Sequence, residues 1–85
     1  MTIRLDDLMA KARVAVREAL AGYPPVPAAF RQELTIGVEI DGNERVFILY
    51  KAGQGPEDAL VIARAVLNAS TGDVKQVEVF PEHWK

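Results

Sequence analysis

The 85-residue chain has no cysteine, a single histidine (His83) and a single serine (Ser70). The lack of thiols excludes a disulfide framework, a cysteine nucleophile and a thiolate metal site. His83 stands in a C-terminal segment without the nucleophile and orienting group that a catalytic base requires, so we expect an exposed tail residue. A metal centre would need more histidines or closely placed carboxylates. We therefore expect a protein that is not an enzyme and holds no metal or cofactor.

The chain also lacks an excess of either charge and a long apolar run. Ten basic and 12 acidic residues are interspersed and give a formal net charge of -2, so no basic stripe can release counterions from nucleic acid. No apolar run approaches the ~20 residues that cross a bilayer. The first residues mix Arg4, Asp6 and Asp7 with apolar residues, unlike a secretion signal. These features predict a cytoplasmic protein that binds neither nucleic acid nor membranes.

With 49% hydrophobic residues, the chain is typical of globular proteins, and its length suits one domain spanning residues 1–85. Residues 3–21 place apolar side chains at helical spacing and predict an amphipathic helix. Gly22 is expected to end this helix in a left-handed conformation, and Pro24 and Pro25 prevent its continuation.

Two segments alternate as strands do. Residues 34–40 place leucine, isoleucine and valine on one face, the turn Asp41-Gly42-Asn43 follows, and residues 45–51 return with apolar side chains on both faces. Residues 74–80 predict a further strand. The expected core contains the following residues: Leu8, Ala12, Val16, Leu20, Ile36, Val38, Ile48, Val66 and Val77.

The segment from 57 to 70 admits two interpretations. Pro56, Glu57 and Asp58 can begin a helix that Gly72 ends, which would give the order α-β-β-α-β. The β-branched and leucine residues of 60–68, which lead directly into the Thr71-Gly72 turn, favour a strand instead. Local propensity leaves both interpretations open.

Residues 67–74, Leu-Asn-Ala-Ser-Thr-Gly-Asp-Val, are typical of a tight hairpin turn. They resemble the V-D-A-x-T-G-x-V hairpin that ends PepSY domains, with Asn68 in place of the usual aspartate. They are equally similar to a hairpin of small bacterial immunity proteins that act against contact toxins. The resemblance implies an α+β fold of cystatin type, in which one N-terminal helix packs on a curved antiparallel sheet of about four strands (α-β-β-β-β). It also implies a non-catalytic module that acts by binding.

Three residues are candidates for contact with a partner: Asn68, Thr71 and Trp84. Asn68 and Thr71 lie in the hairpin turn, where their side chains can also serve as turn-stabilising hydrogen-bond acceptors. Trp84 can anchor a partner, as aromatic residues do at binding hot spots, or cover the seam between helix and sheet. We expect a module that neutralises a protein partner, such as a toxin or protease. The alternative is a structural domain that forms a homodimer through an unpaired edge strand.

Overall fold

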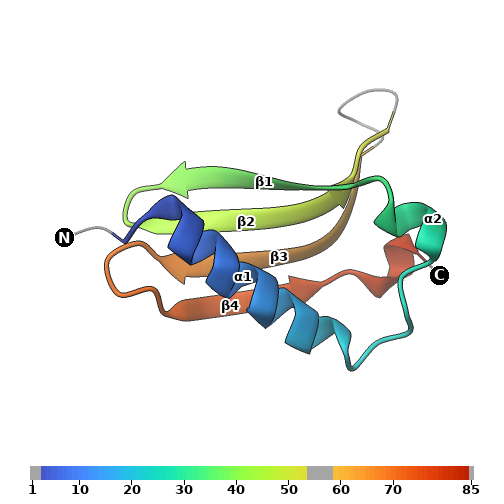
Figure 1. Cartoon of the computed structure of the whole chain (residues 1–85), viewed down its shortest axis with the longest axis horizontal. Coiled ribbons are helices and arrows are strands. Elements are labelled where there is room, and N and C mark those ends of the chain that lie inside the picture. The colour runs from blue at the N-terminus through green and yellow to red at the C-terminus, as the bar shows by residue number, and fades with distance from the viewer. Residues whose placement is uncertain (1–2, 54–58, 85) are drawn as a thin grey trace.

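The computed structural model describes residues 3–53 and 59–84, which form one helical layer on one sheet (Figure 1). Helix α1 spans Leu5–Leu20 and the short α2 spans Ala28–Arg31. The strands are β1 (Leu34–Asp41), β2 (Glu44–Lys51), β3 (Leu60–Asn68) and β4 (Val74–Val79), followed by the 3-10 helix η2 (Pro81–His83). Neighbouring strands pair antiparallel in the order β1-β2-β3-β4. The predicted α+β fold is confirmed, and because residues 60–68 form a strand, the α-β-β-α-β alternative is not needed.

The charged and apolar residues of α1 explain why this segment is helical. Asp6 and Asp7 lie in its first turn and Arg17 in its last, which suits the helix dipole at both ends. The buried residues Leu8, Ala12 and Val16 are spaced by four and line one face. The observed bounds lie within two residues of the predicted ones at each end.

The expected left-handed stop at Gly22 is wrong. The helix ends at Leu20, its C-cap residue Ala21 is right-handed, and Gly22 has no positive φ. The N–H groups of Gly22 and Tyr23 still donate to the carbonyls of Ala19 and Leu20 as the helix tightens. The prolines that follow therefore suffice to stop it, since neither can donate a helical hydrogen bond.

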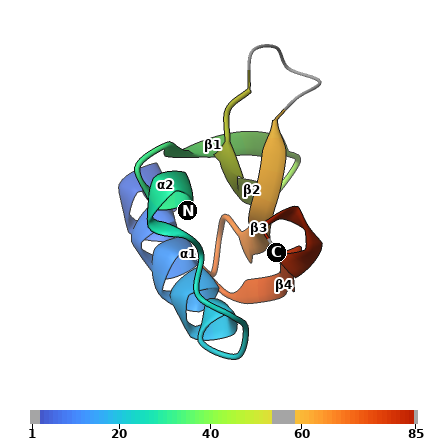
Figure 2. The ribbon, with the colours of Figure 1, turned by 90° about the vertical axis from the view of Figure 1, so that its right-hand side faces the viewer.

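The first hairpin is regular and the second pairing is not. Gly42, with φ of 58°, is the first of two turn residues between β1 and β2, the pattern of a type II′ turn. Between β2 and β3 the register shifts: Leu49 lies opposite Ala63 and Tyr50 opposite Val61, so Ile62 is an extra residue. Such a bulge bends a strand and increases its twist. Figure 2 shows the resulting curvature of the sheet from one end.

The main core lies between α1 and the second half of the sheet. Leu8, Ala12 and Val16 pack with Phe47 of β2 and with a row of fully buried residues on β3 and just beyond: Ala63, Ala65, Leu67 and Ala69. Figures 1 and 2 show that α1 crosses the sheet obliquely, with its C-terminal half over β4 and away from β1. The small side chains of β3 allow the helix to approach the sheet closely at this point.

A second buried cluster closes the opposite end of the sheet. Val26 of the proline-rich connector, Ile62 of the bulge and Trp84 pack together, with Phe30 and Leu34 partly buried beside them. The extra residue in β3 thus supplies the central side chain of this cluster.

The predicted core is confirmed in part. Leu8, Ala12 and Val16 are buried, and Leu20, Ile36 and Val77 are half-buried against the same cluster. Val66 is buried and Ile48 is half-buried, but neither contributes to the core under α1. Both point to the opposite face of the sheet, where Arg64 lies beside them as the cross-strand partner of Ile48. The assignment of Val38 is wrong: its side chain is 37% exposed, since α1 does not extend over β1.

Replacement of Leu8 by alanine should lower the free energy of unfolding by about 2–5 kcal/mol, because it opens a cavity between α1 and β3. Leu8 is 1% exposed. Val14, on the same helix but 49% exposed, provides the control: Val14→Ala should change stability by less than about 0.5 kcal/mol. Urea unfolding followed by circular dichroism measures both. Equal losses in the two variants would contradict this packing of α1.

Candidate functional site

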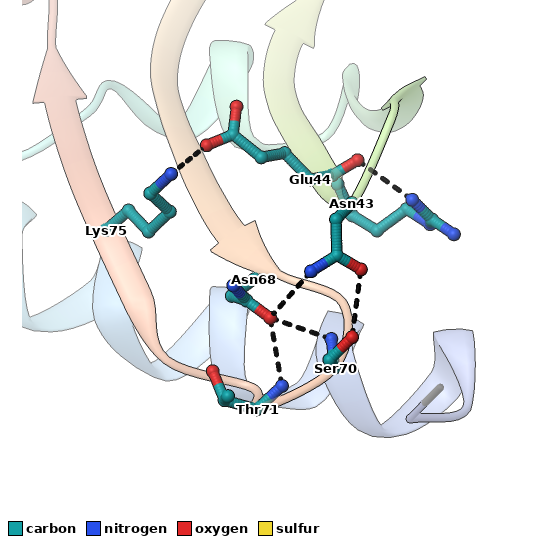
Figure 3. Close-up of polar contacts among 7 residues, drawn as sticks. Asn43, Glu44, Asn68, Ser70, Thr71 and Lys75 are labelled. Carbon is teal, nitrogen blue, oxygen red and sulfur yellow. Dashed lines mark hydrogen bonds and ion pairs between the residues drawn. The ribbon is translucent and has the colours of Figure 1, made fainter. Parts of the chain in front are cut away.

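The predicted residues Asn68 and Thr71 lie together in the turn between β3 and β4 (Figure 3). The Oδ1 atom of Asn68 accepts hydrogen bonds from the backbone N–H groups of Ser70 (2.8 Å) and Thr71 (3.0 Å). The Thr71 hydroxyl accepts one from the N–H of Asp73 at 3.2 Å. Gly72 supplies a φ of 78°, and a Cβ there would lie 2.9 Å from Ile3 Cδ1. Both predicted side chains therefore stabilise the turn itself.

Asn43 joins this turn to the tip of the first hairpin. Its carbonyl accepts the N–H of Ala69 at 2.8 Å, and its side-chain oxygen accepts the Ser70 hydroxyl at 2.9 Å. Its amide nitrogen donates to Asn68 Oδ1 at 3.4 Å. Beside them, Lys75 of β4 pairs with Glu44 of β2 across β3 (Figure 3). Asn43 carries no local signal of this role, because its partners are 25 and 27 residues away.

Trp84, the third predicted residue, lies at the other end of the sheet. Its side chain is 6% exposed, and its indole N–H donates to the Pro24 carbonyl at 3.2 Å. Trp84 thus holds the proline-rich connector against the sheet, as the packing interpretation expects. The structure brings Asn68 and Thr71 together but leaves Trp84 remote from them, and a role of these residues in partner contact stays a prediction.

The expectation that His83 is an exposed tail residue is wrong. Its ring stacks on Phe80 with centroids 5.8 Å apart, and its Nδ1–H donates to the Val61 carbonyl. Val61 lies at the start of β3 and Ser70 just beyond its end. At ~3.3 Å per residue the two positions are roughly 30 Å apart, too far for Ser70 and His83 to act as nucleophile and base.

A groove opens where α1 diverges from β1. Its volume is about 590 Å³, within the range of ligand-binding pockets. Ile36 of β1 and Phe47 and Leu49 of β2 form the floor. Val16 and Leu20 of α1 form one wall, and the connector residues 23–26 close the end. Because the oblique helix covers β3 and β4, Ile36 and Leu49 stay partly accessible, whereas Phe47 lies at the base of the groove and is 1% exposed.

Three arginines surround the groove: Arg13 and Arg17, one helical turn apart on α1, and Arg31 of α2. All three are exposed. Within residues 3–53 and 59–84, none of them forms an ion pair, and the nearby Glu33 is paired with Lys51 at 3.2 Å. The groove therefore combines an apolar floor with a positively charged rim.

The helical pattern alone assigns Arg17 to the solvated face of the helix and gives Arg13 no special role. The helical pattern shows which side chains point away from the core. That Arg13 and Arg17 lie on the side of α1 toward β1 follows only from the diagonal course of the helix across the sheet. Their spacing of four residues was the available signal.

The opposite face of the sheet carries a second, shallower hollow. Ile48, Tyr50 and Val61 line it together with residues of β1. Next to it Arg64 pairs with Glu78 at 3.4 Å, and Glu39 of β1 is part of its lining. The groove beside α1 is the stronger candidate, because its arginines have no ion-pair partner among the described residues.

No family model matches the chain, and neither curated proteins nor solved structures gave a match. The described residues contain no group of three or more histidines or carboxylates that could hold a metal ion. Within the same residues, no helix has the length and apolarity needed to span a bilayer.

Replacement of Asn68 by alanine should lower the free energy of unfolding by about 1–2 kcal/mol, since two backbone N–H groups lose their acceptor. Asn68→Asp keeps an oxygen acceptor at the same place and should retain most of the stability. Thermal and urea unfolding of both variants test this. A drop for aspartate as large as for alanine would show that the acceptor is not what stabilises the turn.

Proposed function

We propose that this protein is a non-catalytic, cytoplasmic binding module that holds an acidic, apolar segment of a protein partner in the groove beside α1. Binding there neutralises the partner by covering the segment. The observation that carries the proposal is the combination of an apolar floor with three rim arginines that form no ion pair with any described residue.

The chemistry of the groove selects the ligand. The accessible parts of Ile36 and Leu49 favour apolar side chains, which leave water when they contact the floor. Guanidinium groups bind carboxylates in a bidentate geometry, so Arg13 and Arg17 suit aspartate or glutamate on the same segment. A segment that alternates acidic and apolar residues satisfies both requirements at once.

The resemblance of the 67–74 hairpin to those of PepSY domains and bacterial immunity proteins supports a role in which the module binds and inhibits another protein. Homo-oligomerisation is the second candidate function. Homo-oligomerisation is favoured by a separate feature, the exposed edge of β1. Pairing of two copies at this edge would leave the groove free for a peptide.

A peptide-display library tests the proposal even though the partner is unidentified. Selection on the immobilised protein should enrich peptides that combine aspartate or glutamate with leucine, isoleucine or phenylalanine. For a synthetic peptide of the enriched sequence, Arg17→Glu should weaken binding about tenfold or more, since a hydrogen bond between charged groups contributes about 1.5–3 kcal/mol. Isothermal titration calorimetry measures the change.

Arg4→Glu is the matched control. Arg4 is exposed, precedes the first turn of α1 and does not line the groove, so the same reversal of charge should leave peptide affinity unchanged. Enrichment of basic peptides, or equal loss of binding in both variants, would contradict the assignment of the groove.

A further inference from the structure

Strand β1 forms one edge of the sheet and presents a long and regular surface. It has eight residues, and its pairing with β2 runs from Leu34 to Asp41 without a register shift. Two of its apolar side chains are exposed, Val38 at 37% and Ile40 at 70%. Unpaired strands with these properties are templates for pairing with another strand.

The opposite edge, β4, is shorter and its pairing is irregular. It has six residues, its register with β3 shifts between Val66 and Leu67, and it carries Lys75, Gln76 and Glu78. Helix α1 also lies alongside it (Figure 1). A bulge, a lysine and a covering element are the devices by which proteins block edge pairing. β4 has all three, and in the part of the chain that the structure describes β1 has none of them.

The backbone of β1 is oriented for pairing. In a hairpin with a two-residue turn, the residues that flank the turn, here Asp41 and Glu44, bond to each other. Because bonding alternates along an antiparallel strand, the odd-numbered residues of β1 bond to β2. The N–H and C=O groups of Ile36, Val38 and Ile40 therefore point outward, away from the sheet.

We propose that two copies of this chain pair antiparallel along β1, with Val38 of one copy opposite Val38 of the other. Ile36 of each copy then lies opposite Ile40 of the other. In this register the exposed side chains of Val38 and Ile40 contact apolar partners on the α1 face of the joined sheet, and the outward N–H and C=O groups bond across the dyad.

Charge and symmetry select this register. A two-fold axis perpendicular to the sheet keeps each face continuous, so opposed residues must share a face. Here Glu39 lies opposite Gly37, and Asp41 lies opposite Thr35, so no like charges meet. Centring on Gly37 would bring Glu33 opposite Asp41, and centring on Glu39 would oppose two glutamates; like charges directly opposite are unfavourable.

The dimer would contain one eight-stranded sheet with both α1 helices on the same face. The two arginine-rimmed grooves would then open on the same side, one on each side of the paired β1 strands. Formation of the dimer does not require the groove to bind a peptide, so the two proposals are tested separately.

Sedimentation velocity over a concentration series tests the pairing. The native chain should shift from monomer to dimer with increasing concentration. Val38→Lys should remain a monomer, because it places two ammonium groups opposite each other at the dyad. Gln76→Lys adds the same charge to the β4 edge and should dimerise as the native chain does. Circular dichroism verifies that both variants are folded.

Disulfide cross-linking tests the register. Because the native chain has no cysteine, each introduced cysteine can form a disulfide only with its copy in the other chain. Residues opposed in a bonded pair have Cα atoms about 5.5 Å apart, within disulfide range. Val38→Cys should therefore form a covalent dimer on mild oxidation, and Val74→Cys, exposed at the other edge, should not. A native chain that stays monomeric at the highest concentration, a dimer that survives Val38→Lys, or more efficient cross-linking through Val74→Cys would each overturn the proposal.

Discussion

The close packing of α1 on the alanines of β3 is the contact on which the rest of the architecture depends. Ala12 of the helix and Ala63 and Ala65 of the strand are fully buried in one cluster. An interface of methyl groups lets a helix lie nearer to a sheet than larger side chains would allow, and close-packed interiors tolerate little change in volume. The position of these alanines on β3, and not on β2, sets α1 over the second half of the sheet.

This displacement of the helix accounts for both surfaces that the chain leaves open. Ile36 and Leu49 would be fully covered by a helix centred on the sheet, but here they are half-buried and form the floor of a groove above the buried Phe47. The same displacement leaves Val38 and Ile40 exposed on an edge strand. The ends of the sheet are fixed independently, one by the hydrogen-bonded turn between β3 and β4 and the other by the tryptophan that packs against the connector.

The secondary structure was predictable because its signals are local. Alternation in residues 34–40 acts over a few positions, and the observed strands agree with the predicted bounds within one residue. Residues 60–68 are the exception, because local propensity left a helix open there and the strand was favoured by the resemblance of the hairpin that follows. The core and the groove were less predictable, because both depend on the course of α1. The alanines of β3 carry little hydrophobic signal, and alternation placed Val38 on the core face without showing whether a helix covers it. The helical pattern likewise assigned Arg17 to solvent. The two hairpin residues selected from a motif stabilise their own turn, and the bond of His83 to a carbonyl 22 residues away has no local signal.

Methyl–methyl nuclear Overhauser effects in the isolated protein measure most directly whether α1 packs on β3 and leaves the β1 side of the sheet open. We expect strong effects between the methyl groups of Leu8 and Ala12 on the helix and those of Ala63 and Ala65 on the strand. A pattern in which the same helix methyls instead contact Val38 would place α1 over β1 and contradict this arrangement.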